Sequence, residues 1–333
     1  MKDKTISRRK IIKQGVIALS FPLTAFTKTY KMADESKFDV IIIGGSYAGL
    51  SAGMALGRAL RNTLIIDSGK PSNRQTPHSH NFLTQDGKTP KEISTLARQQ
   101  VAAYKTIKFF NGLAISGKKT DRGFEVETEK GNVFNGKKLI FATGVNDIVP
   151  KINGFSECWG ISVIHCPYCH GYEYSNDKTG ILANGEVAFE LGKLISNWTN
   201  DLTVFTNGKS TLKVEQIKKF KLHNIEINET EIDYFNHHKG HLESIVFKNG
   251  KTQNLNVLYS RPAFEQHCHI PQQLNCEITE QRYIKIDPYQ KTTIPGIYAC
   301  GDNSSMLRAV SYAVAMGGIA GGMVNRELIE ETF

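Results

Sequence analysis

The sequence predicts an α/β fold with two dinucleotide-binding units, each a parallel central sheet covered by helices in a three-layer arrangement. Short β-branched runs bounded by glycine, such as 38–43 and 62–66, have the composition of buried parallel strands. Glycine-containing turns at 44–49 and 183–186 follow such runs, and each leads into a helix of small and apolar residues. A strand, a glycine turn and a helix in this order are typical of Rossmann-like βαβ units, and 333 residues suffice for two domains.

The turn 44–49 and the elements on either side of it match the pattern of a dinucleotide-binding fingerprint. It joins the strand 38–43 to a helix over 50–60, and the following strand ends in an aspartate. Glycines let the backbone approach a pyrophosphate at the helix N-terminus, and the acid accepts a hydrogen bond from a ribose hydroxyl. The middle glycine of the fingerprint is a serine here. We expect the dinucleotide to be held by Gly44, Gly45, Ser46, Gly49 and Asp67.

A second candidate site is the stretch His-Cys-Pro-Tyr-Cys-His-Gly-Tyr-Glu near the middle of the chain. Cys166 and Cys169 can close a small disulfide ring or open to a dithiol, and one thiol of such a pair forms a nucleophilic thiolate. His165 and His170 could stabilise that thiolate or carry its proton. Pro167 fits the first turn of a helix, whose N-terminus also favours an anion. The alternative is half of a zinc site with His170 as third ligand, but no second ligand pair stands at a short fixed spacing.

Two distal signatures complete the pattern. A strand over 137–144 ends in Thr143 and Gly144, and a strand over 293–302 ends in a glycine and Asp302 before a predicted helix over 307–322. With the first glycine turn and the cysteine pair, these signatures resemble the flavin-dependent disulfide reductases of the thioredoxin reductase type. The resemblance implies FAD as cofactor, held through its ribityl chain by Asp302. It also implies that Arg308, Ala309 and Val310 lie beside the isoalloxazine ring.

The resemblance covers nearly all of residues 37–333 and implies a domain organisation. The FAD-binding domain is expected to be split into 37–147 and 267–333. Between them, 148–266 would form an inserted NAD(P)-binding-like domain that carries the cysteine pair. Arg74 follows the acid-bearing strand of the first unit and is expected near a phosphate, although a solvent-exposed loop is an equal alternative.

The inserted unit occupies the place where such reductases bind NADPH. Its sequence departs from the dinucleotide-binding fingerprint at two points. Ala183 replaces the first glycine and adds a methyl group where the backbone should meet phosphate. The stretch 206–210, after the next strand, lacks both the ribose acid and an arginine cluster for a 2′-phosphate, and offers only Lys209. NADPH binding remains possible, but a Rossmann-like scaffold without nucleotide is an even alternative.

The resemblance also implies a mechanism, thiol–disulfide exchange coupled to FAD. Cys169 would face the flavin, and Cys166 would attack a thioredoxin-like protein or a small dithiol or disulfide substrate. His170 replaces the aspartate of the common bacterial reductase, and this form resembles the branch that contains dithiol oxidases of sulfur-bridged natural products, which pass electrons to oxygen. The ordinary pKa of histidine suits proton transfer near neutral pH. The alternative classes are a flavin monooxygenase-type enzyme, an amine oxidase and a non-catalytic flavoprotein. The resemblance alone also implies a homodimer.

The first 36 residues predict a targeting signal. Arg8 and Arg9 precede an apolar stretch at about 15–26, which resembles a twin-arginine export signal and is too short to cross a bilayer comfortably. We expect export to the periplasm, although a clean cleavage site is missing and a basic tail on a cytoplasmic enzyme is the alternative. The formal net charge of +9 comes from scattered basic residues, so we expect no nucleic-acid partner and no stable membrane insertion.

Overall fold

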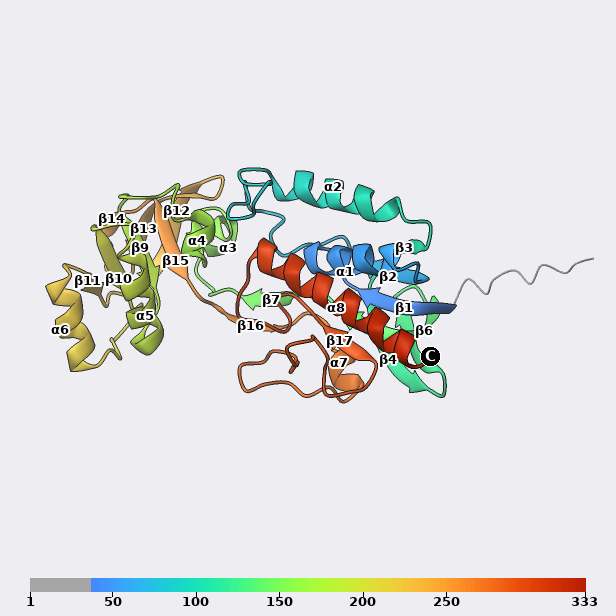
Figure 1. Cartoon of the computed structure of the whole chain (residues 1–333). Coiled ribbons are helices and arrows are strands. Elements are labelled where there is room, and N and C mark those ends of the chain that lie inside the picture. Colours follow the sequence, from blue (N-terminus) through green and yellow to red (C-terminus); the bar gives the residue numbers. More distant parts are fainter. Residues whose placement is uncertain (1–36) are drawn as a thin grey trace, which may run out of the picture. The chain divides into compact units, whose positions relative to one another are not determined.

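The computed structural model describes residues 37–333, and the predicted export signal lies outside the described residues. The first sheet has seven strands (Figure 1). Five of them are parallel, in the order β3-β2-β1-β6-β17, and antiparallel β5 and β4 continue the sheet from the first half of β6. The strands are β1 (Lys37–Ile43), β2 (Thr63–Asp67), β3 (Ile107–Asn111), β4 (Ala114–Thr120), β5 (Gly123–Thr128), β6 (Val133–Phe141) and β17 (Ile297–Ala299).

Strand β6 runs without a break from Val133 to Phe141, so it begins before the strand predicted over 137–144 and ends earlier. On one side β6 pairs with β1 along its length. On the other side its first half pairs with β5, and its second half, from Leu139 to Phe141, pairs with β17. One continuous strand therefore serves both the hairpin and the parallel sheet, and it ends where Thr143 and Gly144 begin the loop at the sheet's carboxyl edge.

Two helices pack closely against this sheet and against each other. Helix α1 (Tyr47–Arg58) and the C-terminal helix α8 (Val310–Glu330) run side by side in Figure 1. A Cβ at Gly317 would lie 2.1 Å from the backbone oxygen of Ala48, so glycine is what allows the two backbones to approach. Helix α8 begins at Val310 and extends to Glu330, whereas the sequence predicted 307–322. Helix α2 (Pro90–Ala102) starts with a capping box between Thr89 and Glu92, and α7 (Ile270–Gln273) is a short turn near β4.

A cluster of charges fixes the end of α8 to the sheet. Glu327 accepts hydrogen bonds from Lys138 Nζ (2.5 Å) and Tyr298 Oη (2.6 Å) and forms an ion pair with Lys291 (2.8 Å). Glu331 also contacts Lys138. Burial by itself would raise the pKa of Glu327, but the hydrogen bonds from Lys138, Lys291 and Tyr298 outweigh it and lower that pKa to about 2.

The second sheet has five parallel strands in the order β11-β10-β9-β15-β8. These are β8 (Val163–Ile164), β9 (Thr179–Leu182), β10 (Leu202–Phe205), β11 (Glu226–Asn228) and β15 (Val257–Ser260). The helices associated with it are α3 (Phe155–Cys158), α4 (Pro167–His170), α5 (Gly185–Ile195) and α6 (Val214–Leu222). Its core is a separate cluster of buried side chains that includes Leu191, Val204 and Tyr259.

Two antiparallel sheets complete the described chain. Strands β12 (Ile232–His238), β13 (His241–Phe247) and β14 (Thr252–Asn254) form a meander, while β7 (Val145–Ile148) and β16 (Ala263–Gln266) form a two-stranded ribbon. His237 and His238 end strand β12, and Lys239 and Gly240, both with positive φ, make the turn to β13.

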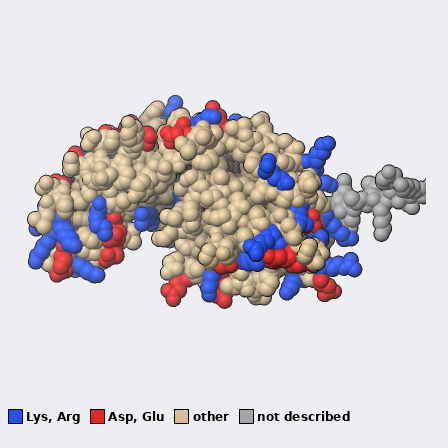
Figure 2. Space-filling model, in the orientation of Figure 1, with Lys and Arg blue, Asp and Glu red and all other residues tan. Residues whose placement is uncertain are grey.

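The surface is mixed in charge. Figure 2 shows Lys and Arg interspersed with Asp and Glu on the visible face. Among residues 37–333, no helix combines the length and the apolar character that crossing a bilayer requires. In the same part of the chain, no three His, Cys, Asp or Glu side chains gather as ligands for a metal ion.

Candidate flavin and disulfide site

The turn between β1 and α1 is shaped by close backbone contacts. Gly44 has φ +104°, and a Cβ there would lie 2.2 Å from the oxygen of Ala142, at the end of β6. A Cβ at Gly49 would lie 1.9 Å from the oxygen of Gly44. The N-cap residue of α1, Ser46, makes no side-chain cap hydrogen bond. The positive end of this 12-residue helix is therefore open to an anionic ligand.

A cavity of about 680 Å³ opens at this turn. Asp67 lies in its wall, where Oδ1 accepts a hydrogen bond from the backbone N–H of Gly45 at 3.1 Å. Arg74 also lines it, and its Nη1 donates to the oxygen of Pro71 at 3.2 Å. The cavity thus collects most of the residues predicted to bind the dinucleotide: Gly44, Gly45, Ser46, Asp67, Arg74, Thr143, Gly144 and Asp302. Gly49 is absent from the lining and acts through the shape of the turn.

A smaller cavity of about 100 Å³ shares walls with the first, including Tyr47, Asp147 and Asp302. It is lined by Arg308, Ala309 and Val310, the residues expected beside the isoalloxazine ring. His165 and His170, which flank the cysteine pair, line it as well. The two cavities therefore bring the fingerprint turn, the distal signatures and the surroundings of the cysteines to one place.

Arg308 is held by two carboxylates at the junction of the cavities. Its Nη1 and Nη2 donate to the two oxygens of Asp147 at 2.7 and 2.8 Å, and its Nε lies 3.6 Å from Oδ2 of Asp302. Burial raises the pKa of Asp302, and Arg308 opposes that shift. Sequence reasoning did not identify Asp147, because its partner stands 161 positions further along the chain.

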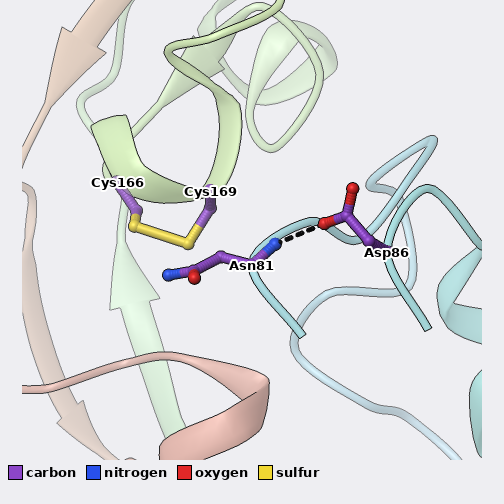
Figure 3. The surroundings of a disulfide bond; sticks show 4 residues. All are labelled: Asn81, Asp86, Cys166 and Cys169. Carbon is purple, nitrogen blue, oxygen red and sulfur yellow. Dashed lines mark hydrogen bonds between the residues drawn. A yellow bond between two sulfur atoms is a disulfide. The ribbon is translucent and has the colours of Figure 1, made fainter. Parts of the chain in front are cut away.

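The cysteine pair lies at the start of α4. Cys166 is the N-cap of this helix, Pro167 occupies its first turn, and the structure joins Cys166 and Cys169 in a disulfide with Cα atoms 5.3 Å apart (Figure 3). Tyr168, 63% exposed, packs edge-on against Trp198. Neither cysteine lines either cavity, whereas the flanking His165 and His170 line the smaller one.

Both flanking histidines are held neutral, contrary to the expectation of a cationic partner for a thiolate. Burial, with a smaller contribution from Arg308, lowers the pKa of His165 to about 4. Burial also lowers the pKa of His170, although Glu173 opposes the shift. At neutral pH each is an uncharged imidazole that can accept or donate one proton but supplies no positive charge.

Sequence reasoning also missed that a loop, which we call the capping loop (78–88), lies beside the disulfide (Figure 3). Backbone hydrogen bonds close it, from Ser79 N to Lys88 O at 2.8 Å and from Gly87 N to Ser79 O at 2.9 Å. His80 connects it to the cysteine segment, because its ring nitrogens lie 3.5 Å from Asp86 and 3.4 Å from Glu173. The only signal in the sequence was the unusual run of polar and aromatic residues after Asp67.

The turn between β9 and α5 corresponds to the turn between β1 and α1. Side chains of the protein itself form hydrogen bonds at this turn. Oδ1 of Asn184, the N-cap of α5, accepts from the backbone N–H groups of Gly185 and Thr211, both at 2.8 Å. Its Nδ2 donates to the oxygen of Lys209 at 2.9 Å. Glu186 stands in the first turn of α5, where its negative charge opposes a phosphate. One N–H group at the end of this helix, that of Gly185, is therefore already bonded within the chain.

The residues at the first cavity fit FAD. The turn offers glycine backbone and an uncapped helix end for a pyrophosphate, and Asp67 is positioned for a ribose. Arg308 and His165 line the adjoining smaller cavity, and their Nε and Nε2 atoms are buried without a hydrogen-bond partner within the described chain. Polar ring edges of a bound flavin would satisfy such atoms, since unpaired buried groups are costly.

The sequence matches the pyridine nucleotide-disulphide oxidoreductase family over residues 38–317, and the chain belongs to that family. Within it, the chain is a thioredoxin reductase-like FAD-dependent oxidoreductase that acts on sulfur groups. Both the predicted fold class and the family resemblance are confirmed.

Individual relatives define the similarity further. Thioredoxin reductase tcpT of Claviceps purpurea is 32% identical over 311 residues, which cover 90% of this chain and 97% of the relative. The crystal structure of an oxidoreductase from Agrobacterium tumefaciens is 38% identical with a TM-score of 0.83, covering 88% of this chain and 99% of that one. The crystal structure of HlmI is 26% identical with a TM-score of 0.84, covering 89% and 94%.

Proposed function

We propose that the protein oxidises dithiols by thiol–disulfide exchange through Cys166 and Cys169, with FAD as the bound cofactor and without NADPH as electron donor. A substrate dithiol gives up two electrons and two protons and leaves as a disulfide. Oxygen, reduced to hydrogen peroxide, is the proposed final acceptor. FAD, when bound, supplies the two-electron store between them. The protein's own residues supply the disulfide, the neutral proton carriers and the binding surface.

The observation that carries the oxidase direction is the closed turn at α5. In a nicotinamide site the N–H groups at this helix end bind pyrophosphate. Here the N–H of Gly185 donates to Oδ1 of Asn184, which also accepts from the N–H of Thr211, and Glu186 stands in the first turn with Lys213 3.8 Å away. In the proposed direction a substrate dithiol supplies the electrons through Cys166 and Cys169, because the direction of exchange follows from electron supply rather than from the thiols themselves.

The substrate is a thioredoxin-like protein or a small dithiol. Several relatives are named thioredoxin reductases, which supports a protein partner. The exposed side chains of Tyr168 and Tyr172 beside the disulfide also suit a small apolar dithiol. The same chain working as a disulfide reductase is the second candidate, and it requires a donor that reaches the flavin by another route.

Anaerobic reduction of the bound flavin tests the direction. Mixing the holoprotein with dithiothreitol should bleach the visible flavin absorbance, and mixing with NADPH should not. Prompt stoichiometric bleaching by NADPH would overturn the oxidase proposal. Replacing Cys166 and Cys169 by serine should abolish bleaching by the dithiol, whereas a flavin monooxygenase-type enzyme would retain its turnover without them.

We also propose that the enzyme is exported by the twin-arginine route. An exported enzyme meets no nicotinamide pool, which agrees with the closed turn at α5. Replacing Arg8 and Arg9 by lysine should retain the protein inside the cell. Detection of the unaltered protein only in the cytoplasmic fraction would contradict export.

A further inference from the structure

The capping loop presents an asparagine to the disulfide. Figure 3 shows the side chain of Asn81 directed toward the bond between Cys166 and Cys169, while its backbone N–H donates to Oδ1 of Asp86 at 2.8 Å. Asn81 has φ +58°, a left-handed conformation that asparagine tolerates better than most residues. Asp86 therefore holds the backbone of Asn81, and the exposed side chain points toward the sulfurs in Figure 3.

The loop is anchored well enough to hold that side chain in place. The neighbouring Phe82 packs against the main core cluster of the first sheet, and backbone bonds close the base of the loop. His80 adds a link to Glu173 on the cysteine segment. Leu83, two residues after Asn81 in the loop, is 87% exposed.

The groups around the disulfide provide no positive charge that would stabilise a thiolate, so a hydrogen-bond donor is required. His165 and His170 are uncharged at neutral pH, and His80 lies between the carboxylates of Asp86 and Glu173. Those carboxylates would oppose an additional negative charge on sulfur. A primary amide carries two N–H donors and no charge, so it can stabilise an anion without being neutralised by them.

We propose that the side-chain amide of Asn81 donates a hydrogen bond to the sulfur that leaves when the disulfide opens. This inference rests on the proposed function. A substrate thiolate forms a bond to the sulfur of Cys166 while the bond between Cys166 and Cys169 breaks, and the electron pair stays on Cys169. The second substrate thiolate then attacks the mixed disulfide, so the substrate leaves oxidised and both cysteines are reduced.

Asn81→Gly is the central test, because glycine keeps the positive φ and removes only the amide. Stopped-flow reduction of the holoprotein disulfide by dithiothreitol should slow by about tenfold, the effect of losing one hydrogen bond to a charged acceptor. In the reduced enzyme, the pH at which alkylation by iodoacetamide reaches half its maximal rate should move upward. Asn81→Asp, which matches asparagine in shape but adds negative charge, should slow reduction further than Asn81→Gly.

Thr84→Gly is the matched control within the loop. Thr84 also has positive φ, at +72°, and is exposed, so its replacement tests whether loosening the loop is enough to produce the effect. Reduction rates and alkylation profiles in Thr84→Gly should stay within about twofold of wild type. Equal slowing in Thr84→Gly and Asn81→Gly, or wild-type behaviour of both Asn81 variants, would overturn the role of the amide.

The cysteine variants separate this inference from the proposed function. If replacing Cys166 and Cys169 abolishes dithiol-dependent bleaching while Asn81→Gly behaves as wild type, the exchange mechanism stands and only the role of Asn81 fails. If bleaching by dithiothreitol persists without the cysteines, the proposed function itself fails.

Discussion

The buried pair between Asp147 and Arg308 allows a quantitative prediction about the flavin site. Asp147 belongs to the ribbon strand β7, Arg308 precedes α8, and their side chains are only 12% and 15% exposed. Removing one partner of a buried ion pair costs about 3–5 kcal/mol, because the other charge is left without compensation. Asp302, 3.6 Å from Arg308, remains as a partial partner. We therefore expect Asp147→Ala to lower the free energy of unfolding by about 3 kcal/mol, at the lower end of that range.

Urea unfolding followed by far-UV circular dichroism, at a fixed excess of FAD, measures this change. Asp147→Asn keeps one accepting oxygen and should lose about half as much. Glu265→Gln is the control on the same ribbon, since Glu265 accepts an exposed hydrogen bond from Asn146 at 2.9 Å and should change stability by at most about 0.5 kcal/mol. An Asp147→Ala protein that unfolds within about 1 kcal/mol of wild type would refute the reasoning.

Three further predictions concern stability and reactivity. The folded-state pKa of Glu327, about 2, lies below its ordinary 4.5, so its contribution is present above about pH 4.5 and is lost as the pH falls toward 2. Glu327→Gln should therefore cost about 3 kcal/mol near neutral pH, and urea titrations at decreasing pH should show the difference from wild type shrinking; a constant difference contradicts the linkage. Gly317→Ala should destabilise by about 1–3 kcal/mol through its clash with α1, whereas Gly322→Ala, with open space around its Cβ, should stabilise by up to about 1 kcal/mol, as thermal unfolding would show. Cys300 is fully buried with its pKa raised to about 12 by burial, so mass spectrometry should find it unlabelled by iodoacetamide in the folded protein, and rapid labelling would argue against this packing.

The sequence alone determined the features that depend on local spacing. The glycine turn at 44–49, the cysteine pair and the strand-helix-strand order are fixed by residues near one another in the chain, and periodicity and turn chemistry report such features directly. These signals sufficed for the fold class and the family.

Only the tertiary structure decided the electrostatics and the surroundings of the disulfide. From the sequence, His165 and His170 could have been cationic partners of a thiolate. In the structure, burial lowers both pKa values and favours the neutral form, and that burial depends on segments distant in sequence. Likewise, Asp147 pairs with Arg308, and Asn81 points toward the cysteines, only after the chain has folded. The sequence showed an eroded turn at α5, whereas the fold showed that Asn184 closes it, because a hydrogen bond requires positions in space that no spacing along the chain specifies.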